Sequence, residues 1–251
     1  MHPISKTLTG QVAFVTGAAH RIGAAIVRTL HAAQMDIVLH YNSSKEQAQA
    51  LWQELESIRP NSVLLLQSDL CQTQQIPDII QKILDWKHRL DLLVNNASTF
   101  YPTPLEQVSE SAWDDLMGTN LKAPFFLAAH AAPLLKEQHG AIINIVDIYA
   151  ERPLKRHPIY TMAKAGNAMM VKTLARELAP DVRVNGIAPG LIMWAAAETN
   201  IVAQEAILRR IPMQCMGTTW DIANTVLFLY RDVGYITGQI ITVDGGRTIQ
   251  Q

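Results

Sequence analysis

Tyr160 and Lys164 are the two residues of this sequence that most directly indicate chemistry. They stand four positions apart in a predicted helix, so their side chains share one face and lie about one turn apart. We expect the Lys164 ammonium to favour the ionised phenol and to lower the pKa of Tyr160 from about 10 toward neutrality. Asp147 stands thirteen positions upstream of Tyr160. The same Tyr–Lys spacing also occurs on ordinary solvated helices, so the surrounding motifs decide its meaning.

A glycine-containing turn follows the first apolar run of the chain. Residues 12–15 fit a buried parallel strand, Gly17 and Gly23 lie in or after the turn, and residues 24–33 have a helical pattern. Backbone N–H groups at such a helix N-terminus attract phosphate. Gly17 allows a tight turn, and Gly23 allows the helix to approach the strand closely. We therefore predict a dinucleotide site here, with ordinary turn chemistry as the alternative.

The composition limits the class of protein. The chain has 251 residues, of which 49% are hydrophobic and 17% charged, so it can bury a substantial core. A net charge of −1 without a basic block argues against a nucleic-acid partner. Cys71 and Cys215 are far apart, which argues against a disulfide scaffold and fits a reducing cytosol. Residues 1–6 lack the apolar core of a signal peptide, and no apolar run is long enough for a membrane span. The histidines form no metal-binding motif, so no metal is expected.

Apolar runs alternate with helical patterns along the chain. The predicted strands are residues 12–15, 37–40, 63–67, 90–94, 141–146, 183–187 and 240–243, and the predicted helices are residues 24–33, 45–58, 76–86, 111–136, 158–178 and 220–230. Apolar strands that alternate with helices are typical of a parallel sheet buried on both faces. We therefore predict one α/β domain over residues 1–251, a Rossmann fold with a doubly wound, seven-stranded parallel sheet and helices on both faces.

Residues 192–212 interrupt the alternation between the sixth and seventh predicted strands. They follow Pro189 and Gly190, which places them beyond the C-terminal end of a strand, where ligands bind in open α/β sheets. We interpret this segment as a small helical lid over the substrate. An amphipathic helix that closes the core is the alternative.

Several motifs occur in an order and at spacings that resemble the short-chain dehydrogenase/reductase family. They are Thr16-Gly17 with Gly23, Asn95-Asn96-Ala97, Asn120, Tyr160 with Lys164, and Pro189-Gly190. This resemblance covers almost the whole chain. It implies that Asn120, Tyr160 and Lys164 are catalytic, with Asn120 holding a water that links Lys164 to solvent. An ordinary hydrogen bond to the helix backbone is the alternative role for Asn120.

Two positions depart from the usual pattern of that family. Arg21 replaces the middle glycine of the first motif, and Asp147 replaces the serine usually found thirteen positions before the tyrosine. Together with residues 95–105, these departures resemble the pteridine reductases, which reduce biopterin and dihydropterins, and often folates, with NADPH. Residues 160–164 and 184–186 share that resemblance. The dihydromonapterin reductases, a related bacterial branch, share the aspartate and are the nearest alternative.

The chemistry of a pterin suits an aspartate at position 147. A pterin is a flat, electron-poor heterocycle whose C=N bonds take a hydride at carbon and a proton at nitrogen. The Asp147 carboxylate can orient the Tyr160 phenol or relay protons to it from water. A serine would only donate to a carbonyl oxygen, as ketone-reducing relatives need. A structural role for Asp147, capping the region of Pro158 or pairing with Arg152, is the alternative.

The resemblance also implies a cofactor site made of several loops. Its expected residues are Gly17, His20, Arg21, Ile22, Gly23, His40, Tyr41, Asn42, Ser43, Ser44, Asp69, Leu70, Asn96, Ala97, Ser98, Tyr160, Lys164, Pro189, Gly190 and Leu191. We expect NADPH rather than NADH, because residues 39–44 contain no acidic side chain to repel a 2′-phosphate. Arg21, Ser43 and Ser44 can donate to that phosphate. Asp69 or the Leu70 backbone is expected to bond the adenine, with a helix N-cap as the alternative for Asp69.

The expected substrate contacts form a smaller set. They are Arg21, Ser98, Phe100, Asp147, Tyr160 and Trp194. Phe100 follows the fourth predicted strand and can stack on the pterin opposite the cofactor, a contact worth roughly 1–3 kcal/mol by analogy with base stacking. Core packing is the alternative for Phe100, and Trp194 is a further candidate for the pocket wall.

The sequence therefore predicts a cytoplasmic, NADPH-dependent pteridine reductase whose substrate is a pterin or folate. A general carbonyl or 3-oxoacyl reductase of the same fold is the alternative enzyme, and a cofactor-sensing protein without catalysis is the alternative outside enzymes. Residues 111–136 and 158–178 carry apolar side chains on more than one helical face, which predicts a dimer through these helices. The edge strand 240–243 and the family resemblance predict a homotetramer.

Overall fold

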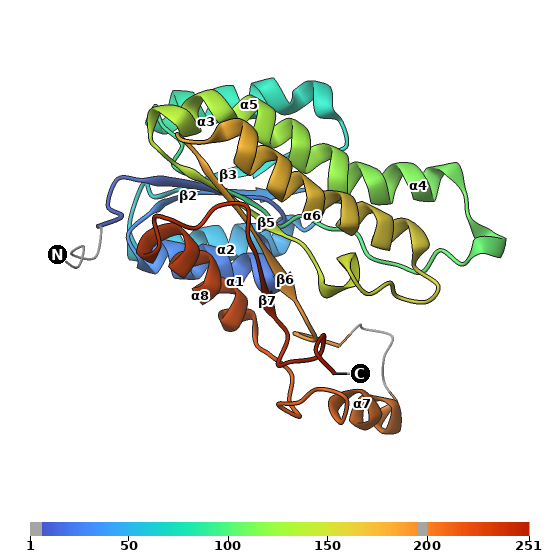
Figure 1. The fold of residues 1–251 in the computed structure, drawn as a ribbon. Helices are drawn as coiled ribbons and strands as arrows, with labels where there is room; N and C mark the ends of the chain where they lie inside the picture. Colours follow the sequence, from blue (N-terminus) through green and yellow to red (C-terminus); the bar gives the residue numbers. More distant parts are fainter. Residues whose placement is uncertain (1–6, 195–199, 251) are drawn as a thin grey trace.

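The structure is a computed structural model that describes residues 7–194 and 200–250; residues 1–6, named above for the absence of a signal peptide, lie outside the described part. Seven strands form one parallel sheet in the order β3-β2-β1-β4-β5-β6-β7 (Figure 1). The strands are β1 (Val12–Val15), β2 (Asp36–Tyr41), β3 (Val63–Gln67), β4 (Leu92–Asn95), β5 (Ala141–Ile145), β6 (Arg183–Pro189) and β7 (Ile240–Val243). Each predicted strand is present, and the predicted fold class is confirmed.

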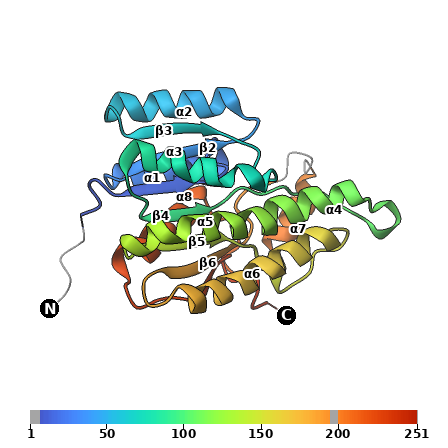
Figure 2. The same cartoon turned by 90° about the horizontal axis from the view of Figure 1, so that it is seen from above.

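Helices cover both faces of this sheet. They are α1 (Arg21–Ala32), α2 (Lys45–Ile58), α3 (Ile76–Lys87), α4 (Glu110–Met117), α5 (Ala123–Glu137), α6 (Pro158–Leu178), α7 (Ile201–Leu208) and α8 (Thr219–Leu227). Helices α3, α5 and α6 lie side by side over one face, and α1, α2 and α8 lie over the other (Figures 1 and 2). No helix of the described residues is long and apolar enough to cross a membrane.

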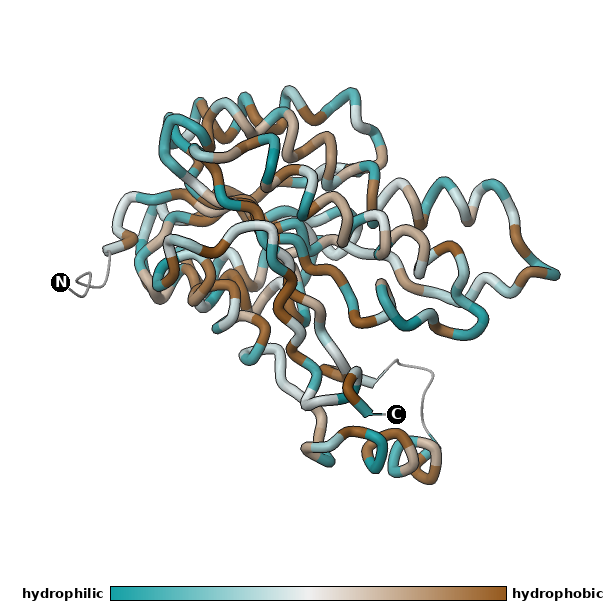
Figure 3. Tube along the Cα trace, viewed as in Figure 1, coloured by the Kyte–Doolittle hydropathy of each residue, from teal (hydrophilic) through white to brown (hydrophobic). Residues whose placement is uncertain are grey.

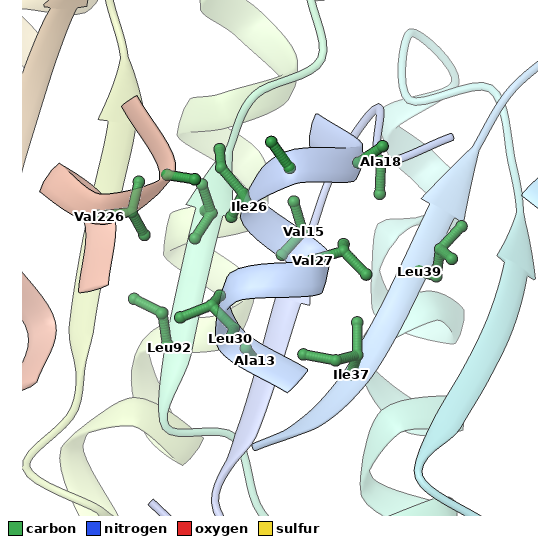
Figure 4. Packing of buried hydrophobic residues seen from close by; sticks show 14 of the residues in the cluster. Ala13, Val15, Ala18, Ile26, Val27, Leu30, Ile37, Leu39, Leu92 and Val226 are labelled. Carbon is green, nitrogen blue, oxygen red and sulfur yellow. The ribbon is translucent and has the colours of Figure 1, made fainter. Parts of the chain in front are cut away.

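Alternation along β1 explains why the strand is apolar throughout. Ala13 and Val15 pack in the core cluster under α1, whereas Val12 and Phe14 pack in the cluster on the opposite face. On α1, Ile26, Val27 and Leu30 share one face and are fully buried against the sheet. Figure 4 shows this packing of α1 on β1 and β2, with Val226 of α8 closing one side. The parallel sheet is thus buried on both faces, as its sequence predicts.

The predicted single helix over residues 111–136 is interrupted in the structure. A π-helical turn, η3 (Gly118–Lys122), separates α4 from α5, and the Ala123 N–H donates to the Gly118 carbonyl five residues back. Pro124 has no N–H, so it cannot make the ordinary helical bond to the Asn120 carbonyl four residues before it. The sequence analysis did not consider that a proline within a helix leaves the carbonyl four residues before it free for another donor.

The predicted lid segment contains a short helix that does not close the core. α7 lies apart from the sheet, beyond the C-terminal ends of β6 and β7 (Figure 1), and none of its residues is buried. Ile201 and Val202 of α7 are 69% and 76% exposed, and brown apolar positions are visible along this helix in Figure 3. α7 itself therefore does not pack in the core, whereas Ile192 and Ile211 of the same segment are buried, and the lid stays a prediction. Residues 195–199 of the predicted lid lie outside the described part of the chain.

Candidate active site

A cavity of about 1070 Å³ opens at the C-terminal ends of β1, β2 and β4. This is the point where the strand order reverses, and open α/β sheets bind ligands there. Most of the predicted cofactor residues line it: Gly17, His20, Arg21, Ile22, Gly23, His40, Tyr41, Asn42, Ser43, Ser44, Asp69, Asn96, Ala97 and Ser98. Phe100 lines the same cavity at the end predicted for the substrate.

The glycine turn after β1 is shaped by close backbone approach. Gly17 has φ +59°, and a Cβ there would lie 2.8 Å from the Cα of Ala97. A Cβ on Gly23 would meet the Gly17 carbonyl and the Asn96 side chain. The turn is therefore compatible with glycine alone at these two positions, which allows the close backbone approach found in phosphate-binding turns.

The loops after β1 and β4 are tied into one unit by Thr16 and Asn96. The Asn96 side-chain amide donates to the carbonyls of Thr16 and Gly17, both at 2.9 Å. In return, the buried Thr16 hydroxyl accepts from the backbone N–H groups of Asn96 and Ala97, both at 3.0 Å. The Asn96 side chain therefore holds the glycine turn. The sequence analysis named Thr16 only as part of a motif and did not predict that its hydroxyl joins the two loops.

His40 serves the same turn from behind. Its Nδ1 accepts from the Gly17 N–H at 3.1 Å, and its Nε2 donates to the Ser68 carbonyl at 3.0 Å. Burial lowers the pKa of His40 to about 4, so the ring is neutral and fits this donor–acceptor pattern. Both nitrogens of His40 are engaged within the protein. The predicted cofactor residue therefore shapes the phosphate turn rather than offering a free polar group.

The far end of the cavity carries the residues predicted for the 2′-phosphate. Arg21 and Ser43 are exposed and Ser44 is half-buried, directly before the N-terminus of α2. Arg21 occupies the left-handed region with φ +55°, the conformation that the family's usual glycine adopts without strain. Asp69 lines this region and accepts from the Cys71 N–H at 3.0 Å. The alternative role as a helix N-cap is wrong, because Gln72 is the N-cap of the next helical segment, η1 (Thr73–Gln75).

The catalytic residues predicted from the sequence meet behind Phe100. The Tyr160 hydroxyl donates to Oδ2 of Asp147 at 2.6 Å, and Oδ1 of Asp147 accepts from the Tyr149 N–H at 2.9 Å. The Lys164 ammonium is buried, donates to the Ile145 carbonyl at 2.9 Å, and lies 5.7 Å from the centre of the Tyr160 ring. β5 and the short turn η4 (Ile148–Ala150) position Asp147, and α6 positions the other two.

The charges in this cluster differ from the sequence-based expectation. Burial and the neighbouring Asp147 raise the pKa of Tyr160 well above its ordinary value. Burial also raises the pKa of Asp147, although bonds from Tyr160 and Tyr149 and the charges of Lys164 and Arg247 oppose it. Burial lowers the pKa of Lys164 to about 8. The predicted lowering of the Tyr160 pKa is therefore wrong for the free protein, because burial and the adjacent Asp147 disfavour the phenolate.

Asn120 is held by more bonds than either sequence interpretation included. Its side-chain nitrogen donates to the carbonyls of Leu116 and Thr99 at 2.9 and 3.0 Å, and its side-chain oxygen accepts from the Ser98 hydroxyl at 2.6 Å. The bond to Leu116 is the ordinary helix bond given above as the alternative. The Asn120 carbonyl, freed by Pro124, accepts from the Asn167 side chain at 2.8 Å.

Asn167 of α6 is the last donor of a buried amide chain that begins on β4 and β5. The side-chain nitrogen of Asn95 donates to Asn144 at 2.9 Å, and that of Asn144 donates to Asn167 at 2.9 Å. All four asparagines are at most 3% exposed. The amide dipoles therefore align head to tail toward the Asn120 carbonyl, an arrangement in which each bond strengthens the next.

Phe100 contacts the catalytic tyrosine directly. Its ring centre lies 4.8 Å from that of Tyr160 at an interplanar angle of 76°, and 4.8 Å from that of His157 at 10°. Phe100 is 48% exposed, so core packing does not describe it. His157 was missed by the sequence analysis, although its place three residues before Tyr160 on the same chain segment was a usable signal.

Some predicted site residues lie away from the lining of this cavity. Among the described residues, the predicted site residues that do not line the cavity are Leu70, Asn120, Asp147, Tyr160, Lys164, Pro189, Gly190, Leu191 and Trp194. The Leu70 side chain is buried in the core, which leaves only its backbone for an adenine. Met193 reaches the cavity from the segment that follows β6, whereas its neighbour Trp194 does not.

Comparison with known proteins now adds to the geometry. Residues 17–248 match the family model described as enoyl-(acyl carrier protein) reductase. Pteridine reductase 1 from Leishmania tarentolae is 35% identical, over 96% of this chain and 97% of the relative. The 3-oxoacyl-(acyl-carrier-protein) reductase FabG from Staphylococcus epidermidis is also 35% identical, over 93% and 97%. The FabG reductase from Thermotoga maritima is 34% identical, over 96% and 99%.

The chain belongs to the short-chain dehydrogenase/reductase family. Members of this family are oxidoreductases that use nicotinamide cofactors, which agrees with the glycine turn, the cavity and the Tyr160–Lys164 pair. The equal identity to a pteridine reductase and to a 3-oxoacyl reductase leaves the substrate to be argued from the site.

One cationic residue of this short-chain dehydrogenase/reductase was absent from the sequence analysis. Arg247 follows β7, donates to the Tyr149 hydroxyl at 3.2 Å, and lies 5.8 Å from the centre of that ring. Arg152, named above as a possible partner of Asp147, donates instead to the Gln250 carbonyl at 2.9 Å. Sequence separation hid Arg247, because 100 residues separate it from Asp147.

Proposed function

We propose that this protein is an NADPH-dependent pteridine reductase that reduces a dihydropterin, or biopterin itself, toward the tetrahydro form. The observation that carries this proposal is the 2.6 Å hydrogen bond from Tyr160 to Asp147. A carboxylate in this position suits proton delivery to a ring nitrogen, because it returns a proton to the phenol after each transfer.

The residues divide the reduction into separate tasks. NADPH, when bound, supplies the hydride that is added to the pterin carbon. Tyr160 gives its proton to the adjacent ring nitrogen, and Asp147 orients the phenol and replaces that proton from water. The Lys164 charge acts on Asp147, and the same ammonium would contact the ribose of the bound cofactor. Phe100 stacks on the pterin and fixes its distance from Tyr160, while the segment 192–212 forms the lid.

NADPH is the proposed cofactor because of the residues at the far end of the cavity. Arg21, Ser43 and Ser44 provide one positive charge and two hydroxyl donors for a 2′-phosphate. A charge contact at about 4 Å is worth roughly 1–4 kcal/mol, depending on exposure, so the preference over NADH should exceed about tenfold. Equal kcat/KM values for the two cofactors would remove this part of the proposal.

A second candidate function is 3-oxoacyl or general carbonyl reduction. The FabG relatives, as similar in identity as the pteridine reductase, favour it. The Asp147 carboxylate disfavours it, since a carboxylate beside the phenol adds no donor to a carbonyl oxygen. Within the pterin class, dihydromonapterin is an alternative substrate to dihydrobiopterin, and dihydrofolate is a further one.

A steady-state substrate comparison tests the proposed function. Purified protein would be assayed with NADPH and with dihydrobiopterin, dihydromonapterin, dihydrofolate and a 3-oxoacyl thioester in parallel. The proposal expects one of the pterins to give the highest kcat/KM. A 3-oxoacyl thioester turned over faster than every pterin would replace it with the second candidate.

The proposed setting is the cytoplasm, and the proposed assembly is a homotetramer. Cys71 and Cys215 are free thiols, which suits a reducing compartment. Large apolar side chains are exposed on α5 and α6, and β7 lies at the edge of the sheet. Both surfaces suit contacts between copies of the chain.

A further inference from the structure

The turn after β7 holds Arg247 in a fixed place. Oδ1 of Asp244 accepts from the Gly246 N–H at 2.8 Å, and its Oδ2 accepts from the Thr248 N–H at 2.7 Å. These two bonds flank Arg247 on both sides, so its backbone is fixed relative to the end of β7. Arg247 is half-buried, which limits the freedom of its side chain.

Arg247 reaches the turn that carries Asp147. Its guanidinium donates to the Tyr149 hydroxyl at 3.2 Å and lies 5.8 Å from the centre of the ring. The Tyr149 N–H in turn donates to Oδ1 of Asp147 at 2.9 Å. Tyr149 is thus fixed at both ends, by Arg247 through its hydroxyl and by Asp147 through its backbone.

Four groups act on the Asp147 carboxylate in the described structure. Tyr160 and Lys164 face it from α6, Tyr149 from its own turn, and Arg247 from the chain after β7. Lys164 and Arg247 are the two cations of this set. Burial lowers the pKa of Lys164 to about 8, so its charge fades in mildly alkaline solution. A guanidinium stays protonated throughout that range, which makes Arg247 the permanent positive charge among these four groups.

We propose that Arg247 is a positioning residue of the active site, which anchors the Asp147 turn through Tyr149 and keeps the carboxylate ionised to accept the Tyr160 hydrogen bond. This inference rests on the proposed function for its catalytic meaning, since Asp147 is assigned there to proton return. The effect of Arg247 on the position and charge of Asp147 does not depend on the substrate. A titration of the Asp147 carboxyl group therefore tests the role of Arg247 separately from the proposed function.

The test compares Arg247→Met and Arg247→Lys with Arg152→Met as the matched control. Arg152 also links the Asp147 region to the C-terminal segment, but it exerts no comparable charge effect on Asp147. The Asp147 carboxyl would be titrated by ¹³C NMR, with its signal assigned through Asp147→Asn. The pH profile of kcat/KM with NADPH and dihydrobiopterin would be recorded for the same variants.

Arg247→Met should raise the pKa of Asp147 by about half to one unit, because an opposite charge beyond direct contact is removed. The acid limb of the kcat/KM profile should move to higher pH by the same amount. Arg247→Lys should restore most of the shift, and Arg152→Met should cause none.

An unchanged Asp147 titration in Arg247→Met overturns the inference, and so does an equal shift in Arg152→Met. Failure to reduce any pterin, together with the expected NMR shift, overturns the proposed function and leaves the electrostatic role of Arg247 intact. Thermal unfolding of each variant at neutral pH confirms that the titrated protein is folded.

Discussion

The Tyr160 hydroxyl donates to Asp147 in the free protein, so the phenol keeps its proton and hydrogen-bonds a carboxyl oxygen. This arrangement reverses the sequence-based expectation of a phenolate beside Lys164. Position alone could place Tyr160 and Lys164 on one helical face, but it could not give their burial. Desolvation is a property of the whole fold, and here it raises the pKa of both acids.

Removing the phenol hydroxyl should remove most of the activity. Tyr160→Phe should lower kcat by at least about a hundredfold, the usual scale for losing a positioned acid. The ring still packs against Phe100, so the variant should fold, with a lower melting temperature because the buried Asp147 loses a donor. Steady-state kinetics and thermal unfolding measure these quantities. A variant that keeps more than a tenth of the wild-type kcat contradicts the role given to Tyr160.

The pH dependence of cofactor binding should report Lys164. Its pKa is lowered to about 8, so the ammonium is present below that pH and is lost as the pH rises through it. If the ammonium contacts the cofactor ribose, the dissociation constant for NADP⁺ should increase between pH 7 and pH 9. Calorimetry over this range would measure it. Lys164→Met should bind weakly and without that dependence; a pH-independent wild type speaks against the contact.

At the scale of elements, an unusual turn between two helices places Asn120. Pro124 leaves the Asn120 carbonyl without its helical donor, and Asn167 from α6 supplies one. The buried amides of Asn95 and Asn144 continue the chain under the site. α5, α6 and the sheet are thereby held in one relative position, which sets the distance from Lys164 to the loop of Ser98.

Breaking this amide chain should lower kcat more than the loss of an equally buried asparagine away from the site. Asn167→Leu removes the acceptor of the Asn144 side-chain nitrogen, which keeps only the Met170 sulfur at 3.8 Å, and the donor to the Asn120 carbonyl. Each weakened or lost bond should cost about 1–3 kcal/mol of stability. We expect kcat to fall about tenfold as the π-helical turn relaxes. Asn185→Leu is the control, because Asn185 is equally buried and bonds Ile236 and Gln239 away from the site. Equal kcat values in the two variants would show that the chain is only structural.

The elements themselves were largely predictable from the sequence. Each predicted strand forms, and the helix over residues 45–58 and that over residues 158–178 have their predicted ends. Local periodicity is sufficient for these because each element buries a continuous apolar face. The break at residues 118–122 was missed, because a π-helical turn depends on Pro124 together with a donor from α6. The contact of Arg247 with the Asp147 turn was missed for the same reason, as it joins distant segments.

At the scale of the whole molecule, exposed apolar side chains that gather on one face mark a surface for contact between copies of the chain. Phe125 on α5 is 46% exposed and Met169 on α6 is 60% exposed, and these two helices are neighbours on one face of the sheet (Figure 2). Phe125 contacts the neighbouring Phe126 ring, which is itself 36% exposed, so this apolar surface faces outward, as the proposed assembly requires.

Light scattering should therefore give a tetramer, with four times the 27.9 kDa of one chain, or about 112 kDa. Met169→Glu should shift the mass toward smaller species, because it places a charge in the buried contact. Ile58→Glu is the control, since Ile58 is 69% exposed at the end of α2 on the other face. A wild-type mass near 28 kDa at micromolar concentration contradicts both the dimer and the tetramer.

The exchange of Asp147 for serine tests the central claim most directly. The wild type and Asp147→Ser would be compared by kcat/KM for dihydrobiopterin and for a 3-oxoacyl thioester, each with NADPH. The account predicts that the variant loses at least about tenfold in pterin reduction while any thioester reduction is unchanged or higher. Full pterin activity in Asp147→Ser would contradict the proposed mechanism.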